Sequence, residues 1–108
     1  MFFSDEAVAE YIRCFSNPAT IHASCEDYRA AASIDLEHDR QNYLANAKIT
    51  CPTLILWGKN GTMGQCYDVL ETWNARYNSI TGKGLSCGHY LAEEKPNEVY
   101  DAFVSFFN

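Results

Sequence analysis

The feature that most constrains the fold is a short apolar run near the middle of the chain, Leu54-Ile55-Leu56-Trp57, which follows Pro52 and ends at Gly58. An unbroken apolar run between turn residues is typical of a strand buried on both faces, as in a parallel sheet. A weaker strand is predicted at about residues 78–81. Two parallel strands do not make a stable sheet alone, because such sheets need more strands and helices on both faces. We therefore expect the sequence to be the C-terminal part of something larger.

The segments around these strands alternate with them. A helix is predicted through Tyr67, Leu70 and Trp73, between the two strands. A Gly-rich loop, residues 82–89, follows the second strand, and Pro96 begins a last helix with a buried stripe that includes Phe103. The order strand, helix, strand, loop, helix is that of the end of a doubly wound α/β fold.

The first half of the chain is patterned as three short helices, at about residues 5–15, 18–32 and 33–45. Ser4 is a good N-cap for the first helix, and Asn17 followed by Pro18 ends it and begins the second. Their apolar stripes are too narrow for a core of their own, so they are expected to form a lid. The predicted division is residues 1–46 as the C-terminal part of a helical cap and 47–108 as the C-terminal part of an α/β core.

Composition excludes several classes of protein. The 108 residues include 14 acidic and 8 basic side chains, a net charge of −6, which lacks the basic footprint that nucleic-acid binding requires. The sequence contains no run of about 18 apolar residues, so no membrane span is predicted. Its acidic start is unlike a secretory signal peptide. The five cysteines are odd in number and form no CxxC pair, so we expect reduced thiols, no metal and a cytoplasmic location.

The order of motifs resembles the last third of an α/β-hydrolase, and within that superfamily the haloacetate (fluoroacetate) dehalogenases. The resemblance covers essentially the whole chain. It is carried by the stretches CEDYRAAA at 25–32, DLEHD at 35–39, ITCP at 49–52, LWG at 56–58 and CGHYLAEE at 87–94. The pattern GH-x-L-x-E-E-x-P fixes only the superfamily, whereas the first two stretches are more specific to the haloacetate branch.

The resemblance implies a two-step hydrolysis without a cofactor. In that family an Asp displaces halide from a small 2-haloacid, a His activates water to cleave the resulting ester, and a second Asp orients the His. His89 matches the family's base, because it follows the last strand in a loop at the sheet edge where catalytic groups collect. A histidine also has a pKa suited to a base near neutrality.

Tyr28 is the second candidate site residue. In the resembled family a Tyr of this stretch reaches from the lid into the halide pocket, where its hydroxyl stabilises the departing anion. The alternative is a tyrosine packed on the lid's apolar stripe with Ile21 and Cys25. His22 and His38 are expected to be solvated or salt-bridged.

The sequence departs from many α/β-hydrolases after the first strand. Their triad acid follows a W-G-x-x-D pattern, but here the loop reads Trp57-Gly58-Lys59-Asn60-Gly61. Haloacetate dehalogenases carry the acid one strand earlier, so its absence favours them. Asp68 lies too far along the following helix to replace it. No G-x-D-x-G or G-x-S-x-G elbow is present, so the chain alone lacks a nucleophile and a triad acid, and whether it acts as an enzyme by itself stays open.

Three alternatives remain. The first is the corresponding part of an epoxide hydrolase. The second is a truncated product without independent catalysis that associates through exposed apolar faces, for example as a homodimer. The third is a cysteine hydrolase that uses Cys87 with His89, although no oxyanion elbow accompanies that pair.

Overall fold

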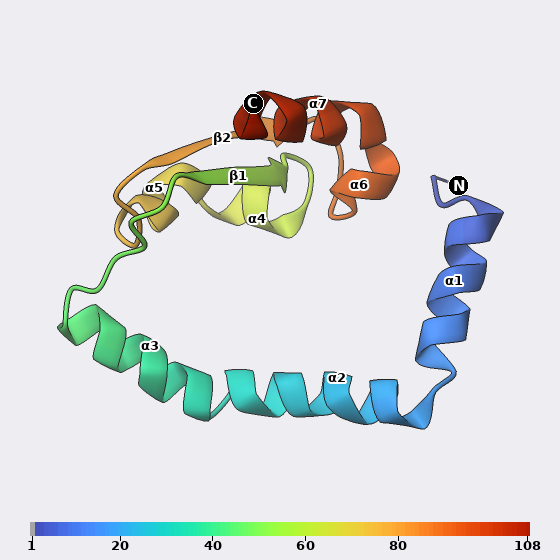
Figure 1. Cartoon of the computed structure of the whole chain (residues 1–108), viewed down its shortest axis with the longest axis horizontal. Helices are drawn as coiled ribbons and strands as arrows, with labels where there is room; N and C mark the ends of the chain where they lie inside the picture. Colours follow the sequence, from blue (N-terminus) through green and yellow to red (C-terminus); the bar gives the residue numbers. More distant parts are fainter. Residues whose placement is uncertain (1) are drawn as a thin grey trace. The chain divides into compact units, whose positions relative to one another are not determined.

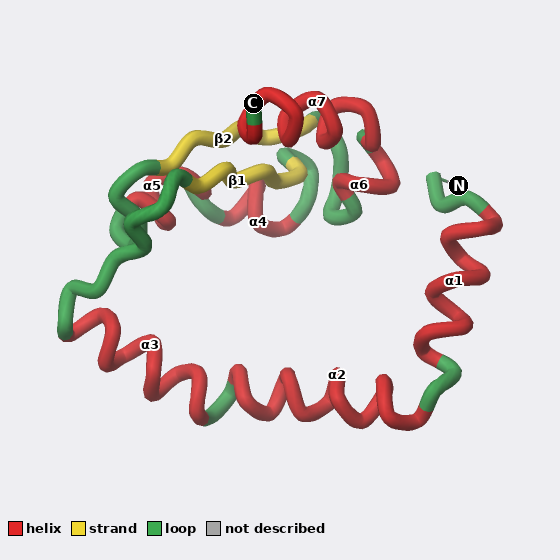
Figure 2. Tube along the Cα trace, in the orientation of Figure 1, coloured by secondary structure: helices red, strands yellow, loops and turns green. Residues whose placement is uncertain are grey.

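The computed structural model describes residues 2–108, which form seven helices and two strands (Figure 1; Figure 2). In chain order they are α1 (Asp5–Phe15), α2 (Pro18–Ala31), α3 (Ile34–Leu44), β1 (Thr53–Gly58), α4 (Thr62–Cys66), α5 (Val69–Asn74), β2 (Ile80–Leu85), α6 (Leu91–Glu94) and α7 (Pro96–Phe107). The chain divides into two compact units, which hold Phe3–Ala47 and Lys48–Asn108.

The first unit consists of α1, α2 and α3. The hydroxyl of Ser4 accepts a hydrogen bond from the Ala7 N–H at 3.1 Å, and the Asn17 side chain accepts one from the Ala19 N–H at 2.9 Å, so both predicted caps are present. None of the residues in these three helices is buried. The unit therefore has no core of its own, and its role as a lid stays a prediction.

The second unit is built on two parallel strands. β1 pairs with β2 in a register that runs from Thr53 opposite Ile80 to Gly58 opposite Leu85. Figure 1 shows α7 on one side of the strands and α4 and α5 on the other, the arrangement of an α/β fold. The predicted fold class and the parallel strand at the apolar run are confirmed.

The second strand lies further along the chain than the sequence predicted. It spans residues 80–85 rather than 78–81, and so it passes through glycines that were assigned to a loop. A Cβ at Gly82 would overlap the carbonyl oxygen of Ile55, and one at Gly84 would lie 2.9 Å from Nε1 of Trp57. These glycines allow β2 to lie close against β1 and its side chains, and they do not interrupt the strand.

The helix predicted between the strands is two helices. Tyr67 has extended backbone angles (φ −133°, ψ 147°) and ends α4, and the carboxylate of Asp68 then accepts a hydrogen bond from the Glu71 N–H at 3.0 Å. An Asp that caps a new helix start explains the break. A second difference is α6, a single helical turn within the segment predicted as a loop.

Little apolar surface is buried in the part of the chain that the structure describes. The buried apolar residues are Val69, Leu85 and Cys87, all in the second unit. No helix within residues 2–108 combines the length and apolarity needed to cross a membrane.

Candidate functional site

His89 lies in the loop between β2 and α6, at the carboxyl ends of both strands. Ligands of open α/β sheets bind at this edge. The imidazole borders a cavity of about 150 Å³, whose other lining residues are Leu56, Trp57, Gly58, Gly61, Met63, Gly88 and Leu91. The side chain predicted to be the base is thus exposed and lies beside a small, largely apolar recess.

The loop that carries His89 is held against the loop that follows β1. The Lys59 N–H donates to the carbonyl of Leu85 at 2.9 Å, and the Asn60 N–H donates to the carbonyl of Cys87 at 3.0 Å. A Cβ at Gly58 would overlap the carbonyl oxygen of Gly88. The backbone before His89 is therefore fixed by hydrogen bonds and by close contact with β1's end.

Glu94 holds the backbone on both sides of His89. One carboxylate oxygen, Oε1, accepts a hydrogen bond from the Gly88 N–H at 2.9 Å, and the other, Oε2, accepts one from the Tyr90 N–H at 3.0 Å. No role for Glu94 was predicted from the sequence. The capping-box spacing puts a glutamate three residues after the N-cap, which is Glu93 here, whereas Glu94 lies four residues after Tyr90.

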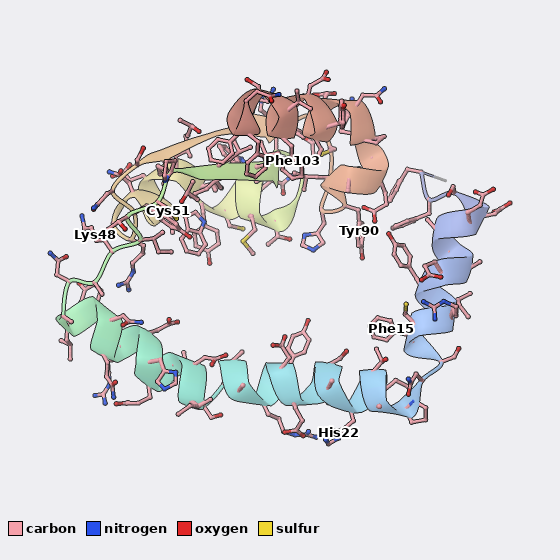
Figure 3. All side chains as sticks on the ribbon, in the orientation of Figure 1. Phe15, His22, Lys48, Cys51, Tyr90 and Phe103 are labelled. Carbon is pink, nitrogen blue, oxygen red and sulfur yellow. The ribbon has the colours of Figure 1, made fainter. Side chains whose placement is uncertain are left out.

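The ring of His89 also contacts the ring of Tyr90. Their centroids are 5.2 Å apart with an interplanar angle of 82°, an edge-to-face arrangement. Figure 3 shows the Tyr90 side chain projecting from the beginning of α6. This contact limits the orientations that are open to the imidazole.

Cys87 is placed poorly for a nucleophile. The residue is 5% exposed, and burial, followed by the nearby charge of Glu94, raises the pKa of its thiol above the usual value. A reactive cysteine needs the opposite shift, because the thiolate is the attacking species. The geometry therefore argues against a cysteine hydrolase.

The loop after β1 supplies no triad acid. The W-G-x-x-D pattern puts its acid at the position of Gly61, and the N–H of the preceding Asn60 donates to the Cys87 carbonyl. The sequence predicted that Asp68 lies within a helix. In the structure it instead caps the start of α5. Within residues 2–108 no carboxylate hydrogen-bonds to the imidazole of His89.

Tyr28 belongs to the other unit, on α2, and its side chain is 79% exposed. Ile21 and Cys25 on the same stripe are exposed too, so the stripe is not a core within that unit. His22 projects from α2 into solvent (Figure 3), and His38 on α3 is likewise exposed. The participation of Tyr28 in one site with His89 stays a prediction.

The remaining candidate groups are clusters of metal-binding side chains and the cysteines. No group of three or more His, Cys, Asp or Glu side chains within the described residues is placed to hold a metal ion. All five cysteines carry free thiols.

Comparison with known proteins places this arrangement in a superfamily. The chain is 34% identical over 106 residues to a soluble epoxide hydrolase from Corynebacterium sp. (strain C12), covering 97% of the chain and 35% of the relative. It is 31% identical over 96 residues to a fluoroacetate dehalogenase from Burkholderia sp., covering 89% and 31%. A solved structure from Nostoc sp. PCC 7120, described as an α/β-hydrolase, matches with a TM-score of 0.92 and 55% identity over 99% of this chain and 36% of that one. No protein-family model matches the sequence.

The two parallel strands and their helices are part of an α/β-hydrolase fold. The chain corresponds to about the C-terminal third of an α/β-hydrolase and is similar to an epoxide hydrolase and a fluoroacetate dehalogenase. The chain thus spans about a third of the length of the curated relatives it matches.

Proposed function

We propose that the chain supplies the base, His89, and part of the lid of a haloacetate dehalogenase-like hydrolase. The observation that carries the proposal is the fixed loop of His89 beside a small apolar recess at the sheet edge. The recess has a volume of about 150 Å³, and its lining residues are mostly apolar.

The proposed chemistry has two steps. A carboxylate from outside this chain attacks the α-carbon of a haloacid, and the carbon–halogen bond breaks with its electron pair leaving on the halide. His89 then takes a proton from water, and the resulting hydroxide adds to the ester carbonyl. The ester bond breaks with its electron pair on the alkoxide oxygen, which takes the proton from His89 to give a 2-hydroxy acid, and the enzyme carboxyl loses its proton to solvent to regenerate the carboxylate.

The absence of a triad acid from the loop after β1 favours the dehalogenase over the epoxide hydrolase. The loop after β1 has Gly61 at the acid position of the W-G-x-x-D pattern, and Asp68 is engaged as a helix cap. In the resembled dehalogenases the acid lies one strand earlier, outside this chain. An epoxide hydrolase is the second candidate, because the Corynebacterium epoxide hydrolase matches more of the chain than the Burkholderia dehalogenase does.

Tyr28 is proposed as a hydrogen-bond donor to the departing halide. Its hydroxyl is exposed on α2 and is therefore available to a substrate. Donors aimed at developing negative charge stabilise a transition state most when the leaving group is a poor one.

The proposed partners are a small haloacid and the segments that complete the sheet, with a homodimer as a further mode of association through exposed apolar faces. The net charge of −6 and the free thiols are consistent with a cytoplasmic protein that binds no nucleic acid.

A chimera tests the proposal. The matching third of the Burkholderia fluoroacetate dehalogenase is replaced by this chain, and fluoride release from fluoroacetate is compared with diol formation from a small epoxide. We expect fluoride release, and His89→Ala should stop after one turnover with the covalent ester visible by mass spectrometry. His22→Ala, which removes an exposed histidine on α2, is the matched control and should turn over normally.

Two results would contradict the proposal. Multiple turnover by His89→Ala would remove His89 from the mechanism, and turnover of the epoxide alone would favour the epoxide hydrolase. Tyr28→Phe should slow release of fluoride more than release of chloride, and equal effects would leave Tyr28 as a lid residue only.

A further inference from the structure

The carboxylate of Glu94 accepts hydrogen bonds from the two residues next to His89 in the chain. Its two carboxylate oxygens each accept one backbone hydrogen bond, from the N–H before His89 at 2.9 Å and from the N–H after it at 3.0 Å. A single side chain thus spans the residue that carries the imidazole. The ideal Cβ of Gly88 would lie 3.2 Å from Oε2, so the glycine also lets the carboxylate approach closely.

These two bonds fix the Cys87–Gly88 and His89–Tyr90 peptide groups. The second group adjoins the Cα of His89 and the first lies one residue before it, so together they restrict the direction in which the imidazole leaves the backbone. Both donors lie before or at the start of the four-residue helix α6, where N–H groups have no helical partner. Hydrogen bonds to an ionised carboxylate are shorter and stronger than those between neutral groups.

The carboxylate of Glu94 adds to the contacts on the C-terminal side of His89, where the Tyr90 carbonyl also accepts hydrogen bonds from the Glu93 and Glu94 N–H groups at 3.2 and 2.9 Å. The preceding backbone is held by the bond from Asn60 N–H to the Cys87 carbonyl and by the close approach of Gly58 to Gly88. The Tyr90 N–H bond to Glu94 constrains the backbone that follows His89. Without the Glu94 carboxylate, the His89–Tyr90 peptide would lose the hydrogen bond at its N–H.

We propose that Glu94 is a positioning residue that sets the direction of the His89 imidazole by holding the Cys87–Gly88 and His89–Tyr90 peptide groups. The inference rests on the proposed function only in the assignment of His89 as the base. Glu94 contacts neither substrate nor the reacting atoms in this role.

The test is made on the 108-residue chain by NMR. In the unaltered chain we expect a scalar coupling across each hydrogen bond, from the Gly88 and Tyr90 amide nitrogens to the Glu94 carboxyl carbon. In Glu94→Gln, where one acceptor oxygen is replaced by a donor, we expect hydrogen exchange of at least one of the two amides to accelerate about tenfold, which corresponds to the loss of about 1.4 kcal/mol. The ring signals of His89 should shift in the same variant.

Glu98→Gln is the matched control, since it removes the same charge from the adjacent helix α7, where Glu98 pairs with Lys95 at 3.3 Å. It should leave the two amides and the His89 ring unchanged. Absence of both couplings in the unaltered chain would overturn the proposal, and this measurement needs no folded variant. Accelerated exchange with unchanged His89 ring signals would also overturn it, because Glu94 would then stabilise the turn without directing the imidazole.

The chimera separates this inference from the proposed function. If Glu94→Gln lowers kcat with KM unchanged, the positioning role extends to the reaction. A chimera that is inactive with Glu94 and His89 intact refutes the proposed function, whereas the couplings and exchange rates decide the role of Glu94 by themselves.

Discussion

At the scale of single residues, Gly58 is the position with the least room for a side chain. A Cβ there would overlap the carbonyl oxygen of Gly88 and lie 2.7 Å from its carbonyl carbon. Since both are backbone atoms, relief requires the two loops of the site to separate. In the chimera, we expect Gly58→Ala to lower the free energy of unfolding by about 1–3 kcal/mol in a urea titration followed by circular dichroism.

Gly61→Ala is the matched control, because a Cβ at Gly61 would meet its nearest backbone atoms, in Gly88 and His89, at 3.4 Å, an ordinary contact distance. That variant should be neutral or slightly stabilising, as expected where alanine fits the native backbone. Equal losses of stability in the two variants would contradict the steric explanation.

The buried thiol of Cys87 makes the stability of the fold depend on pH. Burial raises the pKa of its thiol, so the protonated form is favoured in the folded state. The associated stability is present below the thiol pKa of the unfolded chain, about 8.5, and is lost as the pH rises above it. Alkylation with iodoacetamide at pH 8.5, followed by peptide mass spectrometry, should label Cys87 more slowly than the exposed Cys25 and Cys51. Equal labelling rates would contradict a protected thiol, and in Cys87→Ser the loss of stability above pH 8.5 should be smaller.

The candidate base could be identified from the sequence, but its support could not. His89 was singled out because it follows a strand and lies within a motif of known order. The role of Glu94 depends on the turn of α6, which brings a carboxylate back to two amides of its own loop. A sequence pattern gives the spacing of these residues, but not the path of the backbone between them.

At the scale of secondary-structure elements, Asp68 decides where the helix after β1 is broken. Its carboxylate accepts the Glu71 N–H and so caps α5. Asp68→Ala should lower the free energy of unfolding by about 1 kcal/mol, whereas Asp68→Asn, which also caps well, should change it by only a few tenths. Urea unfolding of both variants measures the difference.

The same pair of variants tests whether Asp68 serves as a triad acid. In the chimera, Asp68→Asn should keep the rate of fluoride release, because the amide retains the cap. A folded Asp68→Asn chimera without turnover would show that the carboxylate takes part in the reaction and that the acid is not outside this chain.

The helices with clear caps and stripes could be predicted closely, and the elements set by tertiary contact could not. α1 and α2 begin where Ser4 and Asn17 place them, because a cap is a local interaction. β2 extends through Gly82 because β1 lies beside it, and a glycine in a strand is otherwise indistinguishable from one in a turn. The apolar run of β1 predicted a parallel strand correctly. The residues before Gly58 in that strand are half-buried rather than buried on both faces.

At the scale of the whole molecule, the burial pattern agrees with the length comparison. Val69, Leu85 and Cys87 are the buried apolar residues within positions 2–108, while aromatic side chains such as Tyr100 and Phe107 are exposed. The relatives are about three times as long, and the sheet here has two strands. Parallel sheets are normally covered on both faces, so these surfaces correspond to the ones that further segments cover in an α/β-hydrolase.

The last prediction is that the 108-residue chain by itself does not hydrolyse haloacetates, epoxides or activated esters. Covalent hydrolysis at this type of site needs a nucleophile, a base, an acid that orients the base, and donors for developing charge. The described residues offer His89 as a base and Tyr28 as a donor, and they place no carboxylate on the imidazole. Such groups act as a unit, so one member alone retains little of the combined effect. Purified chain incubated with fluoroacetate, with fluoride followed by electrode, should give the same rate as buffer. Fluoride release that His89→Ala abolishes and His22→Ala preserves would contradict the prediction, because it would require a nucleophile within these 108 residues.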